Sequence, residues 1–356
     1  MAAAADPGVS AGSAEGPAIE ASGLVGRYGS TVALDGLDVH AERGEVLGLL
    51  GHNGAGKTTL VRILGCLLLP HAGEARVLGR DIRDPAARRE IRRRIGVLPQ
   101  DPGLYDRLTA AENLFSHGLL YGLSGPTLAR RVDGLLELVG LQGVRRSQVG
   151  TFSGGMKKRL AIARALVNDP ELVFLDEPTT NLDPEAAHAV HGHIVALAAQ
   201  GGRTVVLCTH NLNEAERLCR RVVILRQGRE VASGSPQELE RRFRGARRAE
   251  ITVRSLDEAA LKAVRSAPGV AGVEVAGPKC LRLELAGEGG LPAAVAALVA
   301  AGAEVTRAVD VQPTLEDVYL RLASGGDAGP DGEPWPGGGP GSGWGGSAGR
   351  GGGGRR

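Results

Sequence analysis

The chain has 356 residues, which is enough for one large domain or two modest ones with a buried core. Its formal net charge is only +2, so the chain as a whole is not a polyelectrolyte partner for nucleic acid. The four cysteines show no CxxC spacing and no pairable rhythm, which favours a reduced cytosolic compartment with buried thiols.

Local features of the sequence support a protein that is soluble by itself. The N-terminus, "MAAAADPGVSAGSAEGP", has neither the basic start nor the apolar core of a signal peptide. The longest apolar stretch, "LLGCLLLP", is too short to cross a bilayer. Arginines cluster in "RREIRRR" and "RRFRGARR", and we interpret these runs as solvated helix faces and linkers rather than nucleic-acid or lipid contacts.

The first two segments of the chain differ sharply in composition. Residues 1–18 are mostly Ala, Gly, Ser and Pro and are predicted to be disordered. From residue 19 to 244, short apolar strands such as "GEVLGLLG", "ELVFLD", "TVVLCTH" and "RVVILRQG" alternate with helical periodicity. This alternation predicts an α/β domain with a mostly parallel sheet.

Two further segments follow the basic stretch near residues 241–248. Residues 245–323 read as strand, helix, strand, strand, helix and strand, which predicts a small ferredoxin-like α+β module closed by an amphipathic helix, "TLEDVYLRLA". Leu315, Val318, Tyr319 and Leu322 would form the inward face of that helix. Residues 324–356 are rich in Gly and Pro and are predicted to be a disordered tail.

"GHNGAGKTT", residues 51–59, fits the pattern G-x-x-x-x-G-K-[ST] between an apolar strand and a helical run, which is the context that a P-loop requires. Its glycines let successive backbone N–H groups point at phosphate oxygens. Lys57 would contact the β- and γ-phosphates, and Thr58 would offer its hydroxyl to Mg²⁺. Glycine is common in this chain and lysine is rare, so the lysine argues against an ordinary Gly-rich turn.

Polar residues follow three other predicted strands. "ELVFLDEP" ends in Asp176 and Glu177, "TVVLCTH" ends in His210, and "GVLPQD" ends near Gln100. Functional residues of open parallel sheets gather at the carboxyl ends of strands. We therefore predict that Asp176 and Gln100 help to hold Mg²⁺, that Glu177 polarises the attacking water, and that His210 orients this water.

A second glycine-rich stretch, "TFSGGMKKR" at residues 151–159, precedes a helical run. Ser153 can cap that helix, and the free N–H groups and the helix dipole favour an anion. The chain thus has two candidate phosphate sites.

The motifs in this order resemble those of the nucleotide-binding subunit of an ABC transporter, over residues 19–240. The resemblance implies that Tyr28 stacks on adenine, that Gln100 lies in a loop that couples to a membrane partner, and that Asn181, Leu182 and Asp183 form a dimer contact. It also explains the second phosphate site, because two copies would face head to tail and each would contact the ATP held by the other. The residues implied to bind ATP from the chain's own side are Tyr28, Gly51, His52, Asn53, Gly54, Ala55, Gly56, Lys57, Thr58, Thr59 and Gln100, and those implied to bind it in trans are Ser153, Gly154, Gly155 and Met156.

The resemblance has two departures: Phe152 and Met156 stand where Leu and Gln are commonest, and Asn181 begins the dimer-contact loop. Neither change removes a phosphate donor. The ending "PTLEDVYLRLA" and the signature "SGGM" are similar to those of daunorubicin-type drug-resistance exporters. This narrower resemblance implies an ATPase that drives export of a drug or antibiotic.

The resemblance also implies partners and a location. With no membrane span of its own, the chain would act on a separate transmembrane permease at the inner face of the membrane. The segment between Gln100 and Ser153 would carry that contact, with "LYDRLTAAENLF" presenting Leu104, Tyr105, Leu108, Leu114 and Phe115 unless these form core.

The alternative function is a soluble ABC-type ATPase that acts on a ribosomal or nucleic-acid complex. Such proteins typically carry two cassettes or a coiled-coil insertion, and this chain has one P-loop, one signature and no sustained heptads between them. A P-loop kinase or GTPase would not explain "FSGGM", and the chain has no N-K-x-D motif for guanine. No nucleic-acid partner is expected.

Overall fold

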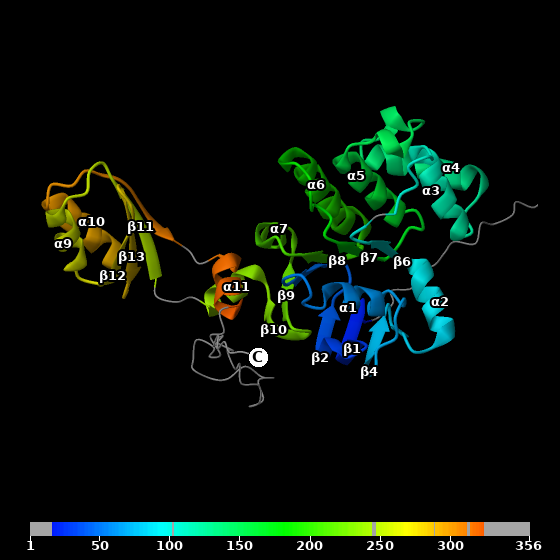
Figure 1. Ribbon diagram of the computed structural model, residues 1–356, viewed down its shortest axis with the longest axis horizontal. Helices are drawn as coiled ribbons and strands as arrows, with labels where there is room; N and C mark the ends of the chain where they lie inside the picture. The colour runs from blue at the N-terminus through cyan, green and yellow to red at the C-terminus, as the bar shows by residue number, and fades with distance from the viewer. Residues whose placement is uncertain (1–15, 102, 244–246, 288, 312–313, 324–356) are drawn as a thin grey trace, which may run out of the picture.

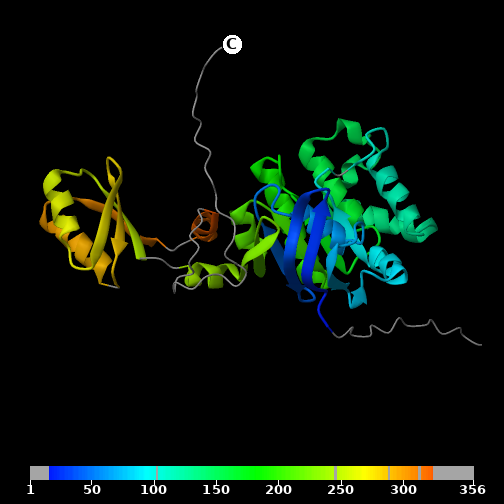
Figure 2. The same ribbon diagram turned by 60° about the horizontal axis from the view of Figure 1, so that its bottom comes forward.

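The computed structural model describes residues 16–101, 103–243, 247–287, 289–311 and 314–323. These residues form three sheets and the helices that cover them (Figure 1). The larger body contains two of the sheets, and the third belongs to a small module that lies to one side of it (Figures 1 and 2).

The central sheet of the body has six strands in the order β10-β9-β3-β8-β7-β6. Its strands are β3 (Val46–Leu50), β6 (Ile95–Leu98), β7 (Leu172–Asp176), β8 (Thr204–Thr209), β9 (Arg221–Arg226) and β10 (Arg229–Gly234). All neighbours are parallel except the β9–β10 hairpin. Every residue of β3, β7 and β8 is buried, as the continuous apolar runs predict for parallel strands covered on both faces.

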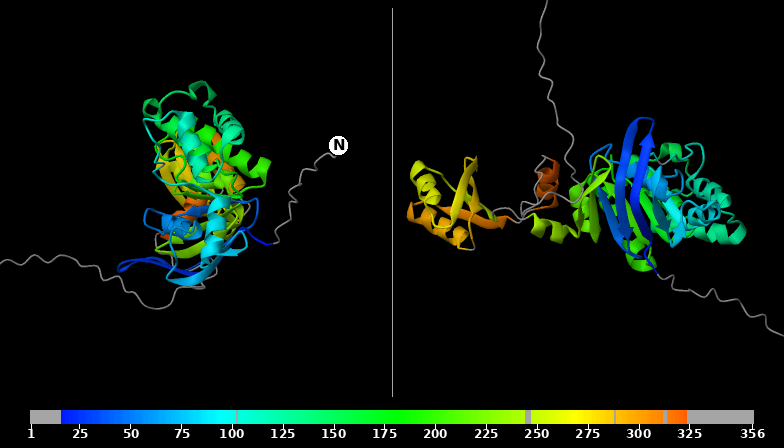
Figure 3. Two further views of the ribbon diagram at one scale, coloured as in Figure 1. Left: turned by 90° about the vertical axis from the view of Figure 1, so that its right-hand side faces the viewer. Right: turned by 90° about the horizontal axis from the view of Figure 1, so that it is seen from below.

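A second, antiparallel sheet has the order β2-β1-β4-β5. Its strands are β1 (Ile19–Tyr28), β2 (Thr31–Ala41), β4 (Ala72–Val77) and β5 (Arg80–Asp81). The long strands β1 and β2 run side by side along one face of the body (Figure 3, right). Helix α1 (Lys57–Leu64) lies between the two sheets, because Leu60 shares one buried cluster with Leu34 of β2 and Leu47 of β3. This packing fixes the start of α1 at the end of β3.

Helix α2 (Pro85–Arg94) lies on the same side of the central sheet as α1, because its buried Ile91 belongs to the cluster that contains Leu60. The other helices of the body cover the opposite face of the sheet and form a helical subdomain. They are α3 (Ala110–Leu120), α4 (Gly125–Leu138), α5 (Gly154–Ala165), α6 (Pro184–Gly201), α7 (Leu212–Leu218) and α8 (Pro236–Arg242), with short 3-10 turns at Gln142–Val144 and Val149–Thr151. Several start at side-chain caps that the sequence signals, such as the capping box of Thr109 and Glu112 before α3. These caps define where the connecting loops end.

The small module has the predicted order of strand, helix, strand, strand, helix and strand. Its elements are β11 (Arg247–Val253), α9 (Glu258–Arg265), β12 (Val270–Gly277), β13 (Cys280–Leu285), α10 (Gly290–Ala300) and β14 (Val305–Val311). The antiparallel sheet has the order β12-β13-β11-β14, and α9 and α10 cover one face. The fold class is therefore a P-loop α/β ATPase fold with a helical subdomain, followed by a ferredoxin-like module.

The last described helix, α11 (Leu315–Ala323), packs against the larger body. Its buried face consists of Leu315, Val318 and Leu322, with Tyr319 packed beside them, as the sequence pattern predicts. The sequence analysis grouped this helix with the ferredoxin-like module, but its partners are α7 and α8, and no residue of α11 belongs to the module's buried cluster. Amphipathic periodicity predicts a buried face without saying which surface covers it.

The ends of the chain, predicted as disordered, lie mostly outside the described residues. Residues 1–15 and 324–356 are not described, whereas Ala18, which the sequence analysis included in the N-terminal segment, is buried and donates its N–H to the carbonyl of Ala41 at 2.8 Å. Over the described ranges, no helix combines the length and the apolar character that a membrane span requires.

Candidate nucleotide site

The P-loop connects β3 to α1 as predicted. Gly54 and Gly56 have φ values of 86° and 110°, a region that residues with a side chain rarely adopt. A Cβ atom on Gly56 would also lie 2.6 Å from the carbonyl oxygen of Ala33. Lys57, at the first turn of α1, is only 6% exposed, and its Nζ donates to the carbonyl of Gly51 at 2.5 Å. The loop is therefore wrapped around its own lysine at the positive end of a helix.

The other loop residues differ in exposure. His52 and Asn53 are exposed, and the His52 ring lies 2.6 Å from the Asn53 carbonyl oxygen. Ala55 and Thr59 are buried against the body, so their side chains support the loop rather than facing solvent. The N–H of Ala55 donates to the carbonyl of His52 at 3.1 Å, and its carbonyl accepts from the N–H of Gly228 at 3.0 Å.

Glu177 lies at the centre of the candidate site and is 7% exposed. Its Oε2 is 2.8 Å from Nδ1 of His210 and accepts a hydrogen bond from the Thr180 hydroxyl at 3.0 Å. Its Oε1 is 3.5 Å from Nζ of Lys57. The structure thus brings together Lys57, Glu177 and His210 from the ends of three strands. A carboxylate that holds a histidine on one oxygen is placed to orient a water and accept its proton.

Asp176, the last residue of β7, is adjacent to the P-loop helix. Its Oδ2 accepts a hydrogen bond from the Thr58 hydroxyl at 3.0 Å. Burial raises the pKa of Asp176, the hydrogen bond from Thr58 opposes this effect, and the nearby Glu177 adds to it. A buried carboxylate beside a hydroxyl supplies the hard oxygen ligands that Mg²⁺ prefers. The described residues contain no group of three or more His, Cys, Asp or Glu side chains arranged as a metal site.

Two predicted residues lie at the edge of this group. Tyr28 ends β1 with 44% of its surface exposed, and its hydroxyl accepts a hydrogen bond from Nη1 of Arg62 at 3.4 Å. Its exposed ring is free to stack on a planar base. Gln100 is exposed in the loop after β6. In the described part of the chain, neither side chain forms a hydrogen bond or an ion pair with Lys57 or Asp176.

The second phosphate motif opens helix α5. The Ser153 hydroxyl accepts a hydrogen bond from the N–H of Met156 at 3.3 Å, which makes Ser153 the predicted helix cap. Gly154 is exposed and has open space where a Cβ would be, whereas a Cβ on Gly155 would meet the Cβ of Ala186 at 2.9 Å. Over the described residues, no hydrogen bond or ion pair joins this motif to the P-loop of the same chain. Ser153 and Gly154 of this motif are exposed, whereas Gly155 is buried.

The candidate dimer-contact loop connects β7 to α6. Asn181 is exposed with a φ of 64°, Leu182 is half-buried against the core, and Asp183 caps α6 by accepting from the N–H of Ala186 at 2.8 Å. Asn181 is thus the member of this trio that is most available to another molecule.

Sequence reasoning missed several polar residues of the site. Thr180 donates a hydrogen bond to Glu177, and the buried Lys158 interacts with Glu177 through charge. The buried Glu214 interacts through charge with Lys158. Burial lowers the pKa of Lys158, and the carboxylates of Asp176, Glu177 and Glu214 oppose that effect. Lysine is rare in this arginine-rich chain, and this rarity could have marked Lys158 as a functional residue. Nothing in the local sequence marks Glu214 as buried.

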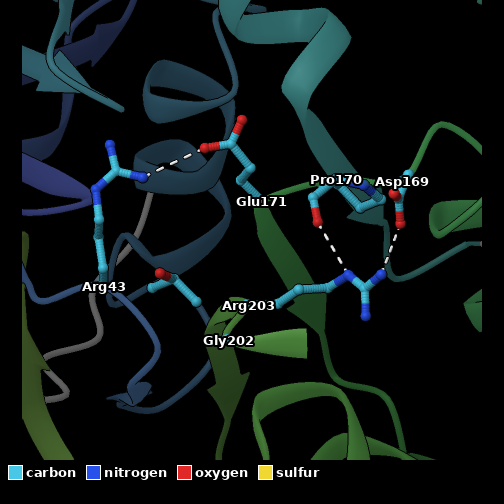
Figure 4. Close-up of a pocket in the computed structure, with 7 residues that line it drawn as sticks. Arg43, Asp169, Pro170, Glu171, Gly202 and Arg203 are labelled. Carbon is cyan, nitrogen blue, oxygen red and sulfur yellow. Dashed lines mark hydrogen bonds and ion pairs between the residues drawn. The ribbon is translucent and has the colours of Figure 1, made fainter. Parts of the chain in front are cut away.

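The cavity in Figure 4 lies at the opposite end of the central sheet. It has a volume of about 170 Å³ and is lined by Arg43, Asp169, Pro170, Glu171, Gly202, Arg203 and Thr204, which precede or begin β3, β7 and β8. Arg43 forms an ion pair with Glu171, and Arg203 forms an ion pair with Asp169 and donates to the Pro170 carbonyl. The cavity is therefore part of a structural ion-pair network at the amino ends of the strands.

Comparisons with known proteins agree with this geometry. Residues 34–180 match the family model described as ABC transporter. The chain is 38% identical over 314 residues to a Nod factor export ATP-binding protein I from Rhizobium sp. (strain N33), which covers 86% of this chain and 96% of the relative. It also matches the solved structure of cbiO1 from Clostridium perfringens, part of the ABC transporter complex cbiONQ, with a TM-score of 0.59 and 29% identity over 63% of this chain and 91% of that one.

A further solved structure is the dimeric post-hydrolysis state of an ATP-binding cassette bound to ADP and Pi. The TM-score is 0.56 with 28% identity, over 61% of this chain and 98% of that chain. Together with the P-loop and the carboxylates at the strand ends, these similarities show that the chain belongs to the ABC transporter family, as an ATP-binding subunit that hydrolyses ATP.

Proposed function

We propose that this chain powers an exporter by closing as a head-to-tail dimer around ATP and driving a separate transmembrane permease. The observation that carries the proposal is the exposed motif at Ser153 and Gly154. Its capped helix start offers phosphate donors, and these make no contact with the P-loop of their own chain. Each chain would therefore supply half of a composite site, with Lys57 on one side and Ser153 on the other.

We assign each residue of the composite site a role. The P-loop and Lys57 bind the β- and γ-phosphates, and Tyr28 stacks on the base. Glu177 takes the proton of the attacking water and His210 holds this carboxylate in place. Asn181, Leu182 and Asp183 line the contact with the second chain. Ser153, Gly154, Gly155 and Met156 contact the γ-phosphate of the partner's ATP.

We also propose Mg²⁺ as the metal of this site. Thr58 and Asp176 fit the role, because the Thr58 hydroxyl and the Asp176 carboxylate are already within hydrogen-bond distance of each other at the P-loop. Gln100 would join them from its exposed loop. When bound, Mg²⁺ would neutralise charge on the β- and γ-phosphate oxygens.

Export is proposed because a relative aligned over almost its whole length is named as a Nod factor export protein. The cargo that we propose for this chain is a drug or antibiotic, on the resemblance of its C-terminal ending to daunorubicin-type exporters. The alternative, a soluble ATPase acting on a ribosomal or nucleic-acid complex, is not favoured by these relatives. Specificity for the cargo would reside in the permease.

The permease contact is proposed for the helical subdomain, at the inner face of the membrane. Of the residues expected there, Tyr105 is 64% exposed, whereas Leu114 is fully buried in the core. The C-terminal end of α3 adds two exposed leucines that the sequence analysis did not single out, Leu119 and Leu120. We treat residues 19–244 as the ATPase domain and 245–323 as the accessory domain, with the qualification that α11 packs on the former.

The test is transport by the reconstituted pair. The neighbouring reading frames would be searched for a membrane protein, the chain would be co-expressed with it, and ATP-dependent uptake of a fluorescent anthracycline would be measured in inverted vesicles. Wild-type chain should drive uptake, and the Glu177→Gln variant should not. If the two proteins fail to co-purify, and ATP drives no uptake, the exporter proposal is wrong even though the ATPase assignment stands.

A further inference from the structure

The loop between β7 and α6 holds two residues in a strained backbone conformation. Glu177 and Asn181 have φ values of 51° and 64°, in the left-handed region that residues with a side chain rarely occupy. Such a conformation is unfavourable and persists where surrounding contacts fix it. The same loop carries the candidate base and the candidate dimer contact, so its exact path determines where both lie.

A buried carboxylate outside the nucleotide contacts holds this loop. The Thr179 hydroxyl, two residues after Glu177, donates to Oε1 of Glu214 at 3.0 Å. Nε2 of His191, from the middle of α6, is 3.0 Å from the same oxygen. Glu214 is only 1% exposed and the His191 side chain 15% exposed, so both contacts are shielded from water.

Glu214 is also connected to the residue that holds Glu177. It lies in the first turn of α7, where its N–H donates to the side chain of Asn211 at 3.2 Å. Asn211 immediately follows His210, whose ring contacts Glu177. One residue thus fixes the start of α7 through its backbone and the β7–α6 loop through its side chain.

Stability alone does not account for a carboxylate in this position. Oε2 of Glu214 and Nδ1 of His191 are buried without a hydrogen-bond partner among the described residues. An incompletely paired buried charge is usually less favourable than an apolar side chain of similar size. The neighbouring Lys158 ammonium interacts with Glu214 through charge but is itself buried at a free-energy cost. A role in placing catalytic groups would explain why a buried carboxylate, rather than an apolar side chain, holds the β7–α6 loop.

We infer that Glu214, held by His191, is a positioning residue for hydrolysis: through Thr179 it sets the distance between Glu177 and His210. The inference rests on the proposed roles of Glu177 and His210. Displacement of a catalytic group by about 1 Å can lower a rate by about 10²-fold, so loss of one anchoring hydrogen bond should lower kcat more than it lowers ATP affinity.

The first test is Thr179→Val, which removes the hydroxyl while keeping the shape of the side chain. We expect kcat to fall about tenfold or more, with little change in the KM for ATP, and Thr179→Ser to restore most of the rate. The control is Thr204→Val at the other end of the sheet, where the hydroxyl of this buried threonine accepts from the N–H of Gly44 at 3.0 Å. It should lower the melting temperature without lowering kcat.

A second pair of variants covers the case in which Thr179→Val does not fold. His191→Leu removes the donor to Glu214, and His191→Gln keeps one; only the leucine variant should lose kcat. An unchanged kcat in both Thr179→Val and His191→Leu overturns the inference, as does a failure of Ser and Gln to restore the rate. Glu177→Gln in the same assay distinguishes a failure of the proposed catalytic role of Glu177 from a failure of the positioning role of Glu214. If Glu177→Gln hydrolyses ATP normally, the proposed base is wrong, whatever the Thr179 result.

Discussion

Gly154→Asp is the substitution that most directly tests the composite site. Gly154 is the first residue of α5, is exposed, and has no atom within 4 Å of the position that a Cβ would take. An aspartate there fits without moving the fold. It also carries negative charge at a helix N-terminus, which stabilises an isolated chain by about 0.3–1 kcal/mol. The variant should therefore fold at least as well as the wild type.

The expected loss of ATPase activity comes entirely from repulsion between the new aspartate and the ATP bound to the second chain. In the head-to-tail arrangement, the new carboxylate would face the γ-phosphate held by the partner chain. Two unit charges about 4 Å apart repel by about 4 kcal/mol at the effective dielectric constant of a protein surface. This energy corresponds to a loss of roughly 10³ in the rate of the closed state. Gly154→Asn, with nearly the same size and no charge, should lose much less.

The assay has two readouts and one mixing experiment. Steady-state ATPase activity should fall in Gly154→Asp, while the affinity of its P-loop for a fluorescent ATP analogue should stay at the wild-type value. Lys57→Ala should be inactive for the opposite reason, because its own P-loop would lack the lysine that contacts the phosphates. A mixture of the two variants forms dimers with one intact composite site and should recover activity. Wild-type turnover by Gly154→Asp, or no recovery on mixing, would refute the shared site.

Three further predictions follow from the same structure. Glu177→Gln keeps the shape of the side chain but removes the base, so kcat should fall by about 10²–10⁴; if it does not, His210 becomes the leading candidate for the base. The specific ATPase rate of wild-type chain should rise with protein concentration in the dilute range, because a composite site needs two chains; a constant specific rate for a strict monomer would contradict this. Burial lowers the pKa of His117 to about 4, so the folded state resists protonation of this ring, and the stability that the neutral ring provides above pH 6.5 should be lost as pH falls toward 4. Melting curves of His117→Gln should lack this part of the pH dependence, and an identical profile would show that another group titrates.

The parts of the site that could be predicted from sequence are those encoded within a few residues. The P-loop is a contiguous motif, and Asp176, Glu177 and His210 directly follow apolar strands that pair in parallel. Because parallel strands end at the same edge of a sheet, their following residues must meet there. The structure confirms this meeting through the contacts of Glu177 with Lys57 and His210.

The parts that could not be predicted depend on contacts between distant helices. In the sequence, Glu214 resembles any charged residue of a short helix, and it is buried where α7 packs against α6. The same limit applies to α11, whose apolar face was visible in the sequence, although the surface that it covers was not. Leu320, on the opposite side of this helix, stays 57% exposed. The periodicity therefore predicted the buried face of α11 correctly, but it did not predict which surface this face packs against.

The distribution of buried charge gives an independent reason to place the chemistry at this edge of the sheet. Six charged residues are buried among those that the structure describes, namely Glu45, Lys57, Lys158, Asp176, Glu177 and Glu214. Five of them interact with one another at the ends of β3, β7 and β8, and only Glu45 lies at the opposite end. Burying three carboxylates and two ammonium groups together opposes folding even when they are paired. A fold retains such a group where it serves ligand binding and catalysis, so this cluster marks the nucleotide site without reference to any motif.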